Sequence, residues 1–553
     1  MEKVLHSNAG RMRRKKLYLL IFCTLSAVIL SLPWLVPHCG AVALVAFLPL
    51  LWADWAADEM EVKHFWLYSF YTFILWNALT TFWVCNATVG GGIFAIVANA
   101  AQMTLVWILF RLTKKYLGGA VPYIFLAVMW IAWERRYFSV DISWPWITLG
   151  NAFAGSTRSV QWYEYTGTLG GSLWIWLCNL SIFGLVRSIA CGVAARWNNM
   201  MRLSSILGIT LAVCGPFVLS KCIYSSYEER SEGSMDVIIA QPNLDPYEKF
   251  GSLTQAEQTE RLLGLFSAAM TASPDSSRRC LLIAPETFTS DIVLQDIESS
   301  PTVRRFREFL SGHPGAEMLF GASTMEFFST AAPPDILARH YGNGWYINRN
   351  TAFLLQTGAP AQMYHKSRLV VGVELTPYPR IFVPLDDWLS RKIGVSSLMG
   401  RCKGQDEASV LTMQDGTALG CAVCYESIYG EYCTGYVNAG AEAMAVITND
   451  AWWGDTPGYK QHLNYSRLRA IELRRDFARC GNTGISCFID QKGDIVSQTD
   501  WWKAQTLRGS INFNTRETFF VRNGDIVGRV STLMFFLLSV LLLIRVLMRK
   551  KLS

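Results

Sequence analysis

Residues 420–426, with the sequence GCAVCYE, form the stretch of the chain that is best placed to carry out chemistry. The apolar run 418–423 predicts a buried strand, and residues 425–429 could open a helix. A thiol between a strand end and a helix start is favoured as a thiolate by the helix dipole, and free backbone N–H groups there can bind an oxyanion. The stretch therefore predicts either a nucleophilic Cys424 or a buried structural cysteine.

Three charged side chains upstream of Cys424 lie next to other predicted strands. Glu286 directly follows an apolar strand, Lys366 precedes another apolar run, and Glu374 comes eight residues after Lys366. A thiol nucleophile needs a base to take its proton, and a buried carboxylate can serve. An ammonium group can hold the oxygen of a tetrahedral intermediate. Each residue alone is typical of solvated surface, but together they supply the parts of an acyl-transfer site.

Cys421 and Cys424 also form a C-x-x-C motif, which could be a redox pair or half of a zinc site. No second C-x-x-C and no H-x-x-x-H follows at ligand spacing, so we expect no metal and no other cofactor. We expect Cys421 to pack in the core.

The composition indicates a chain that is partly solvated by lipid. Hydrophobic residues make up 51%, with 21 Trp and 30 Phe, and the mean hydropathy is +0.22. The net charge of +7 is concentrated in two basic clusters, 11–16 and 549–551, which flank apolar runs. Such clusters orient a protein in a membrane, so we expect no nucleic-acid partner.

Apolar runs of membrane-helix character recur along the chain. The first follows a basic cluster, but no small-x-small cleavage site comes after it, so we expect a retained helix rather than a signal peptide. We predict about eight spans, at 17–36, 41–56, 65–84, 91–112, 121–133, 171–193, 203–219 and 530–547.

The basic residues predict how these spans are oriented. Loops on the side of the N-terminus carry Lys63, Arg111, Lys114, Lys115, Arg196 and Arg202, whereas the opposite loops near Cys39 and Cys85 carry no Lys or Arg. Because cytoplasmic loops are enriched in Lys and Arg, we expect the long segment before the last span to be extracytoplasmic.

The chain therefore divides into a membrane bundle of about seven helices at 1–221, an extracytoplasmic α/β domain at 222–528, and a C-terminal span with a basic tail at 529–553. In the middle domain, apolar patterns predict alternating strands and helices. We expect strands near 235–241, 280–284, 317–321, 351–356, 410–413, 418–423, 443–448, 484–490 and 494–497, and helices at 254–271, 301–310 and 459–480.

Three short motifs, in order along the chain, resemble the Glu–Lys–Cys triad of the nitrilase (carbon–nitrogen hydrolase) superfamily. They are Pro285-Glu286, His365-Lys366 and Cys424-Tyr425-Glu426. With the membrane spans and the NDAWWG segment at 449–454, the chain is similar to the apolipoprotein N-acyltransferase family. The resemblance to this family also extends to five shorter segments, at 241–243, 382–385, 461–462, 467–473 and 482–485. The chain departs from the family at 372–374, where it has GVE instead of the usual FGE.

The resemblance implies an α-β-β-α sandwich for the middle domain and a two-step acyl transfer. Glu286 would deprotonate Cys424, whose thiolate would attack a phospholipid ester, phosphatidylethanolamine being the expected donor. Lys366 and the backbone N–H of Tyr425 would hold the oxyanion, with Glu374 and Glu426 in support. The thioester would then acylate the N-terminal amine of an S-diacylglyceryl-cysteine apolipoprotein.

The same resemblance implies a monomer in the bacterial inner membrane, with its catalytic domain on the periplasmic side. As residues that bind substrate we expect Trp452, Trp453, Phe382 and Trp388. The apolar stretch 380–399 could form a lid over the site, or a loop packed on its own domain.

Three alternatives remain open from the residues. A membrane-tethered amidase would keep the triad and use water in place of the lipoprotein amine. A transporter or scaffold would need ionisable groups within the spans, which are poor in them. A C-x-x-C oxidoreductase would depend on Cys421.

Overall fold

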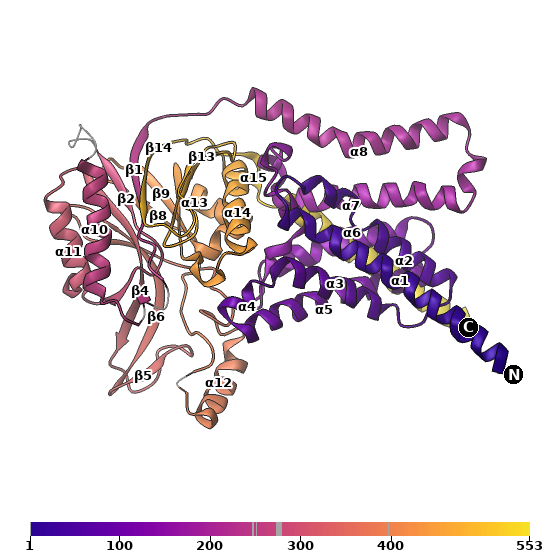
Figure 1. Cartoon of the computed structure of the whole chain (residues 1–553), viewed down its shortest axis with the longest axis horizontal. Coiled ribbons are helices and arrows are strands. Elements are labelled where there is room, and N and C mark those ends of the chain that lie inside the picture. Colours follow the sequence, from indigo (N-terminus) through magenta and orange to yellow (C-terminus); the bar gives the residue numbers. More distant parts are fainter. Residues whose placement is uncertain (1, 246–247, 250, 272–278, 396, 553) are drawn as a thin grey trace. The chain divides into compact units, whose positions relative to one another are not determined.

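The computed structural model describes residues 2–245, 248–249, 251–271, 279–395 and 397–552, and the side chains of those between 14 and 549. It divides into two compact units (Figure 1). One comprises Met1–Ser139, Trp144–Ser226 and Asp525–Ser553, and the other comprises Val140–Ser143 and Tyr227–Gly524. The sequence predicts the corresponding domain at 222–528.

The first unit, here called the membrane unit, is built of helices. They are α1 (Glu2–Leu35), η1 (Gly40–Val45), α2 (Leu48–Glu59), α3 (Trp66–Thr81), α4 (Val84–Ala87), α5 (Val89–Tyr116), α6 (Val121–Tyr137), η2 (Pro145–Ile147), η3 (Leu149–Phe153), η4 (Thr157–Ser159), α7 (Tyr163–Ala190), η5 (Val193–Arg196), α8 (Asn199–Ser226) and α16 (Ile526–Leu552). Each of the eight predicted apolar runs coincides with helix.

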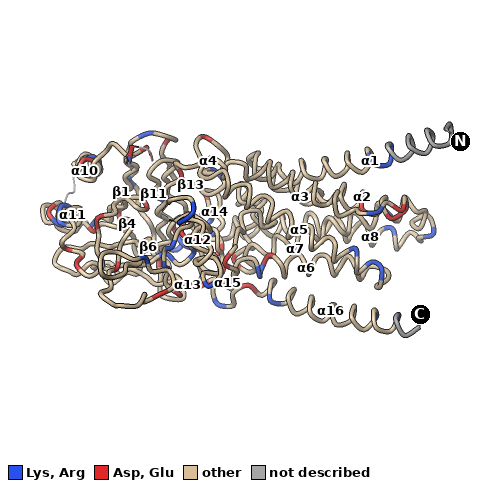
Figure 2. The backbone as a smooth tube through the Cα atoms, turned by 90° about the horizontal axis from the view of Figure 1, so that it is seen from below, with Lys and Arg blue, Asp and Glu red and all other residues tan. Residues whose placement is uncertain are grey.

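Within the described residues, six helical stretches are long and apolar enough to cross a membrane. They are Arg14–Leu35, Gly40–Glu59, Val89–Tyr116, Tyr163–Ala190, Asn199–Ser226 and Ile526–Arg549. Helices α3 and α6 have only 16 and 17 residues, fewer than the roughly 20 that a perpendicular span needs. The count of eight spans thus stays a prediction. Figure 2 shows that charged residues lie mainly at the ends of these helices.

The second unit, here called the α/β unit, contains two sheets. Its strands are β1 (Ser234–Gln241), β2 (Cys280–Ile283), β3 (Thr289–Val293), β4 (Ala316–Phe328), β5 (Arg339–Tyr341), β6 (Gly344–Leu355), β7 (Gln362–His365), β8 (Val410–Thr412), β9 (Ala418–Val423), β10 (Ala443–Thr448), β11 (Phe477–Gly481), β12 (Cys487–Ile489), β13 (Ile495–Gln498) and β14 (Gln505–Asn512). The first sheet has the order β14-β1-β2-β4-β6-β5, with β3 on β4 and β7 on β6, and the second has the order β13-β12-β11-β10-β9-β8.

Helices cover the outer face of each sheet. Helices α10 (Gln255–Thr271) and α11 (Pro301–Ser311) cover the first sheet, and α13 (Gly430–Asn438) and α14 (Pro457–Leu473) cover the second. The unit also contains α12 (Pro379–Ile393), α15 (Phe519–Asn523) and the short 3₁₀ segments η6 (Ile297–Ser299), η7 (Cys424–Ile428) and η8 (Asp450–Trp453).

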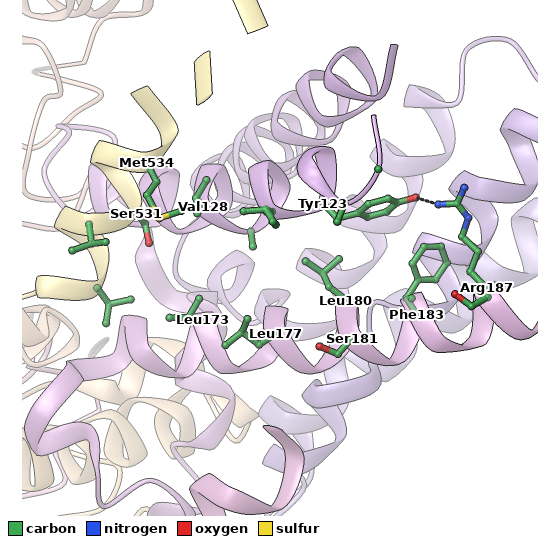
Figure 3. A pocket seen from close by; sticks show the side chains of 18 of the residues that line it. Tyr123, Val128, Leu173, Leu177, Leu180, Ser181, Phe183, Arg187, Ser531 and Met534 are labelled. Carbon is green, nitrogen blue, oxygen red and sulfur yellow. Dashed lines mark hydrogen bonds between the residues drawn. The ribbon is translucent and has the colours of Figure 1, made fainter. Parts of the chain in front are cut away.

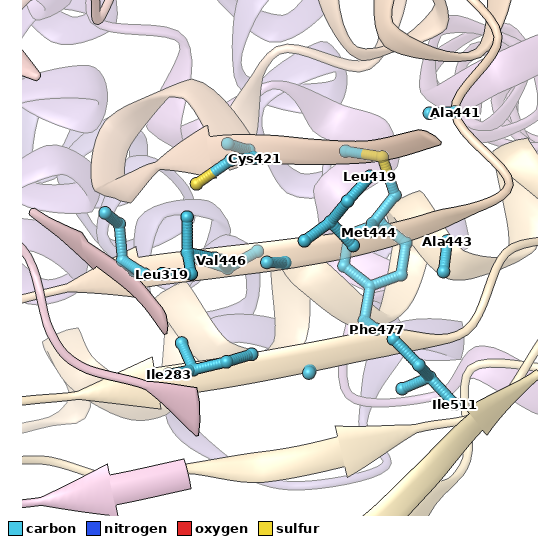
Figure 4. Packing of buried hydrophobic residues seen from close by; sticks show 14 of the residues in the cluster. Ile283, Leu319, Leu419, Cys421, Ala441, Ala443, Met444, Val446, Phe477 and Ile511 are labelled. Carbon is cyan, nitrogen blue, oxygen red and sulfur yellow. The ribbon is translucent and has the colours of Figure 1, made fainter. Parts of the chain in front are cut away.

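Alternate residues of the central strands face two different cores, as a period of two requires. Ile238 and Leu282 pack with α10 and α11 on the outside of the first sheet. Ile283 and Leu319 face the second sheet, where they meet Cys421 and Val446 (Figure 4). The unit is therefore an α-β-β-α sandwich, and the predicted fold class is confirmed.

Each predicted strand overlaps an observed one, but the helix predicted at 459–480 is wrong after residue 473. Helix α14 ends at Leu473, because Arg474 adopts a left-handed conformation with φ of 50°. Residues 477–481 instead form β11, which pairs in parallel with β10. Pairing inside a sheet thus overrides the local helical pattern. Strands β3, β5, β7 and β14 were also not predicted.

One further expectation needs correction. The segment that begins at Cys424 is a five-residue 3₁₀ turn, η7, rather than an α-helix, so it does not supply the α-helix dipole expected beside the thiol. The stretch 380–399 contains helix α12, whose first turn is set by Pro379 and whose last residue precedes the left-handed Gly394. Residue 396 of that stretch lies outside the described residues.

Candidate active site

Cys424 lies directly after β9, a strand in the interior of the second sheet between β8 and β10. Its φ of +53° is in the left-handed region, which costs a non-glycine residue about 1–3 kcal/mol and must be held by surrounding contacts. Its side chain is 9% exposed. Burial and the Glu286 carboxylate raise the pKa of the thiol well above its usual range, while Lys366 opposes them. The resting group is therefore a neutral thiol that needs a base.

Glu286 supplies a carboxylate to the same site from the segment after β2. Its side chain is buried, and Oε1 accepts hydrogen bonds from Lys366 Nζ at 3.0 Å and from Asn350 Nδ2 at 2.8 Å. The next residue, Thr287, has a φ of +45°. The turn after β2 thus directs Glu286 inward at the cost of a strained neighbour.

Lys366 follows β7 and is only 1% exposed. Its ammonium lies 3.0 Å from Oε1 of Glu286 and 2.9 Å from Oε2 of Glu374. Burial works to lower the pKa of Lys366, but the two carboxylates outweigh it, so the pKa lies well above its ordinary value. Lys366 is therefore a permanent buried cation.

Glu374 is held in place from both sides. Its Oε2 accepts the backbone N–H of Val370 at 2.8 Å, and its Oε1 accepts Asn350 Nδ2 at 2.7 Å. Asn350 on β6 thus bridges the two carboxylates that share Lys366. Sequence reasoning missed Asn350 because the predicted strand began one residue later. The β6–β7 hairpin would have revealed it, since Lys366 N–H donates to the Asn350 carbonyl.

Glu426 connects the cysteine segment to the lysine segment. Its fully buried carboxylate accepts N–H bonds from Val423 at 2.8 Å and from Ser367 at 2.7 Å. The hydroxyls of Tyr364 and Tyr436 donate to it at 2.6 and 3.1 Å. Burial raises the pKa of Glu426 although these bonds oppose the shift. Glu426 thus acts on Lys366 through the backbone, whereas Glu374 touches the ammonium directly.

A second buried cluster lies behind the nucleophile. His462 Nε2 is 3.0 Å from the Cys424 carbonyl and 3.1 Å from Ser427 Oγ, and Ser427 also donates to that carbonyl at 2.8 Å. His462 Nδ1 lies 2.9 Å from Oδ1 of Asp450, whose Oδ2 accepts from Arg479 at 2.7 Å. These contacts hold the Cys424 backbone in its left-handed conformation.

Cys424, Asp450 and His462 offer ligand atoms within 4.8 Å of one another, which could suggest a metal site. Arg479, however, already donates to Asp450, and its guanidinium would repel a second cation. Burial works to raise the pKa of Asp450, but Arg479 and His462 outweigh it and the pKa is lowered. The donor set therefore fits a hydrogen-bonded network better than a metal ion.

The remaining predicted residues lie in different surroundings. Cys421 is fully buried between the sheets and is not joined to Cys424, since all fourteen cysteines are free thiols. Tyr425 is buried and donates from its hydroxyl to the Ser143 carbonyl at 3.0 Å. Trp453 packs edge-on against His462 with ring centroids 5.5 Å apart, so it borders the cluster behind Cys424. Trp452 is 40% exposed.

Phe382 and Trp388 lie on α12, whose outer face is apolar. Trp388 is 49% exposed and Lys392 Nζ lies 4.0 Å from its ring centroid, while Phe382 is half-buried. Ile381 and Leu385 continue the exposed face. The inner face carries Asp386, which accepts from Arg401 at 2.7 Å and fixes the helix to its domain.

Comparison with known proteins identifies relatives of both units. A family model described as carbon-nitrogen hydrolase matches residues 314–519, and one described as apolipoprotein N-acyltransferase N-terminal domain matches residues 26–181. The first match contains Lys366, Glu374 and Cys424, and Glu286 lies before it.

Similar proteins of known name span nearly the whole chain. Apolipoprotein N-acyltransferase of Chlorobaculum tepidum is 28% identical over 90% of this chain and 91% of its own length. That of Geobacter metallireducens is 24% identical over 92% of each chain. Among solved structures, Nit3 of Saccharomyces cerevisiae, from the nitrilase superfamily, has a TM-score of 0.37 at 13% identity, covering 52% of this chain and 93% of Nit3. The two matched domains, in this order along the chain, and the full-length relatives make the chain a member of the apolipoprotein N-acyltransferase family.

Proposed function

We propose that this protein transfers an acyl chain from a phospholipid, through a thioester on Cys424, to the N-terminal amine of a diacylglyceryl apolipoprotein. One observation carries the proposal for this chain: the buried ammonium of Lys366 contacts the carboxylates of both Glu286 and Glu374, beside a thiol whose pKa Glu286 raises and Lys366 lowers. Its family membership names the acceptor, since the relatives are apolipoprotein N-acyltransferases.

In the first step Glu286 takes the proton of Cys424, and the sulfur attacks the ester carbonyl of the phospholipid. Lys366 has three N–H donors, and its ammonium lies within 3.1 Å of one oxygen of Glu286 and both oxygens of Glu374, so that one donor can serve each carboxylate. The third is left to stabilise the oxyanion, together with the backbone N–H of Tyr425. When the intermediate collapses, the ester C–O bond breaks, Glu286 returns the proton to the leaving alkoxide, and the lysophospholipid departs.

In the second step the amine of the apolipoprotein attacks the thioester carbonyl. Glu286 takes the proton that the amine loses, the C–S bond breaks, and the proton passes to the sulfur. The products are the amide of the triacylated lipoprotein and the original thiol. The thioester already carries the activation, so this route consumes no nucleotide.

The apolar surface of α12 and the pair Trp452 and Trp453 are proposed to bind acyl chains. Ile381, Leu385 and Trp388 form an exposed stripe at positions i, i+4 and i+7, which suits contact with lipid. Trp453 adds an apolar wall beside His462.

The setting proposed for this reaction is the bacterial inner membrane, with the α/β unit on the periplasmic side. The Lys and Arg bias of the loops supports this orientation, and the apolar helices of the first unit support the membrane. Phosphatidylethanolamine as donor and a monomer as the active form complete the proposal.

The decisive experiment combines the purified protein, phospholipid and a synthetic diacylglyceryl lipopeptide, with mass spectrometry of both products. Equal amounts of lysophospholipid and N-acylated lipopeptide are expected. Release of lysophospholipid at the same rate without lipopeptide would instead indicate a hydrolase.

The thioester is tested with a radiolabelled acyl donor alone. The wild-type protein should acquire label in a hydroxylamine-labile bond, and Cys424→Ala should acquire none. Cys421→Ser is the matched control, because its buried thiol faces the core. If Cys424→Ala is labelled normally, the nucleophile has been wrongly assigned.

A further inference from the structure

An apolar pocket of about 870 Å³ lies within the membrane unit, between α6, α7 and α16 (Figure 3). Its wall is mainly aliphatic and includes Val128, Leu173, Leu177 and Met534. No residue of the pocket belongs to the unit that carries Cys424. The mechanism above therefore makes no use of it.

The pocket is long and runs along α7. From Leu173 to Arg187 the helix rises by about 21 Å, which is roughly two thirds of the hydrocarbon thickness of a bilayer. Its volume is within the range of about 300–1,000 Å³ that is typical of ligand sites. A flexible apolar chain lying along the helix would fit this shape.

One end of the pocket is polar. Arg187 Nη1 donates to the hydroxyl of Tyr123 at 3.1 Å, as Figure 3 shows. The ring of Tyr123 is packed between Phe110 and Phe183, with centroids 5.4 and 5.7 Å away. Arg187 is thus held beside the pocket, and its remaining N–H groups are available to a ligand.

No carboxylate forms an ion pair with Arg187 in the part of the chain that the structure describes. The nearby charges on α2 and α5 compensate one another. Asp54 and Asp58 both pair with Arg111, at 2.5 and 2.6 Å, and both also pair with Lys114. Arg187 therefore leaves one uncompensated positive charge at the end of an apolar pocket.

We propose that this pocket binds a membrane phospholipid as a second lipid site, separate from the donor that reacts at Cys424. The phosphate lies on Arg187 and the Tyr123 hydroxyl, and an acyl chain follows α7 toward Met534. A guanidinium is well suited to a phosphate monoanion, and the aliphatic wall gains from covering a chain. This site goes beyond the acyl transfer and does not depend on it.

The test uses the full-length Cys424→Ala protein, so that no lipid is consumed, in bilayers with a trace of phosphatidylglycerol that carries a diazirine in the middle of one acyl chain. After irradiation, digestion and mass spectrometry locate the label. We expect label on the segments that contain Leu177 and Leu180 and on the start of α16. An even spread over the exposed faces of α5 and α8 would overturn the proposal.

Charge variants test the phosphate contact. Arg187→Gln should lower the label in the pocket about tenfold, and Arg187→Lys should keep most of it. Arg196→Gln, at the end of η5 and outside the pocket, is the control and should leave labelling unchanged. A diazirine diacylglycerol, which lacks the phosphate, should not concentrate there. Equal labelling by both lipids, or by Arg187→Gln and wild type, contradicts a phosphate site.

A filling variant tests the acyl path independently. A Cβ at Gly184, which lines the pocket, would meet no atom within 4 Å, so the side chain of Gly184→Leu starts in open space and should occupy part of the pocket. Gly208→Leu on α8 has the same open surroundings but lies outside the pocket. We expect loss of pocket labelling in Gly184→Leu but not in Gly208→Leu. Equal labelling of the two variants would contradict the proposal that an acyl chain lies along α7.

Discussion

Lys366 has two carboxylate partners, the buried Glu286 at 3.0 Å and the partly buried Glu374 at 2.9 Å, and Asn350 bridges the same two groups. One cation between two anions leaves a net negative charge near the thiol, which fits the neutral resting state of Cys424. The charges around Cys424 therefore favour a neutral thiol at rest rather than a preformed thiolate.

Removing the cation should abolish transfer. For Lys366→Met we expect the rate of thioester formation to fall by about 10²–10³-fold, the usual cost of losing an oxyanion donor. The variant should also unfold more easily, because the carboxylates of Glu286 and Glu374 lose their shared counter-charge. Single-turnover labelling measures the first effect and thermal unfolding the second. Lys403→Met, whose side chain is partly exposed and pairs with Asp335, is the control. Near-normal labelling of Lys366→Met would show that Lys366 does not stabilise the oxyanion.

His462 should act as a positioning residue, since its Nε2 holds the Cys424 carbonyl. His462→Ala should slow thioester formation about tenfold or more by loosening the strained turn. His462→Gln, which keeps an N–H donor, should recover part of the rate. His313→Ala is the control, because that ring lies just after α11, where its Nδ1 is 2.8 Å from the Phe309 carbonyl and far along the chain from Cys424. If the Gln and Ala variants are equally slow while both fold normally, the carbonyl contact is unimportant.

At the scale of elements, the turn after β2 and the strand β4 determine where Glu286 lies. Gly321 on β4 accepts from Phe288 N–H at 2.7 Å and donates to the Pro285 carbonyl at 3.1 Å. These two bonds flank Glu286 in sequence. The carboxylate is thus positioned by backbone pairing between neighbouring segments of the first sheet.

Gly321→Ala should disturb this arrangement. A Cβ there would lie 2.6 Å from Glu286 Cα and 2.7 Å from the Thr287 nitrogen, both backbone atoms that cannot rotate away. We expect activity to fall about tenfold or more, with a stability loss of about 1–3 kcal/mol. Gly264→Ala on α10 meets open space and should be neutral or slightly stabilising. Unchanged activity in Gly321→Ala would show that the turn tolerates displacement.

Asp476 links the two sheets and predicts a pH effect on stability. It precedes β11, and its Oδ2 accepts from the backbone and side chain of Asn512 at the end of β14, at 2.8 and 3.0 Å. Burial raises its pKa from 3.8 to about 6. The native state therefore binds this proton more tightly than the unfolded chain, and the stabilisation is present below pH 4 and is lost as the pH rises through 6.

Asp476→Asn removes this titration. The free energy of unfolding of Asp476→Asn minus that of wild type should rise by on the order of 2–3 kcal/mol as the pH increases from 4 to 7.5. Thermal unfolding in detergent at several pH values gives the comparison. Asp500→Asn, at an exposed ion pair, is the control. A constant difference between Asp476→Asn and wild type at all pH values would mean that the carboxyl is ionised throughout.

At the scale of the whole molecule, one chain combines an apolar helical unit with a polar α/β unit that carries the reactive groups. Both proposed substrates are lipids or lipid-bearing, so a catalytic domain tethered to a bilayer meets them at high local concentration. The lipid site proposed at Arg187 would belong to the membrane unit alone.

The proposed orientation can be tested with reporter fusions. Alkaline phosphatase joined after residue 231, just before β1, should be active because it lies in the periplasm. A green fluorescent protein at the C-terminus should fluoresce in the cytoplasm. The reverse pattern would place the α/β unit inside the cell and contradict the charge bias of the loops.

The sequence by itself determined the features that depend on local pattern. Apolar runs marked the helices of the membrane unit, because burial in lipid requires long uncharged stretches. Short apolar runs indicated the strands, and positions at strand ends drew attention to Glu286, Lys366 and Cys424. Their order along the chain was enough for the resemblance to a family.

Only the tertiary structure decided how these residues meet. Asn350 lies 64 positions from Glu286, and His462 lies 38 positions from Cys424, so no local pattern could join them. β11 forms because β10 offers it backbone partners, although its own residues continue a helical pattern. Contacts between segments that are distant in sequence stabilise this arrangement of the site and of β11. The arrangement therefore forms only when the two sheets assemble.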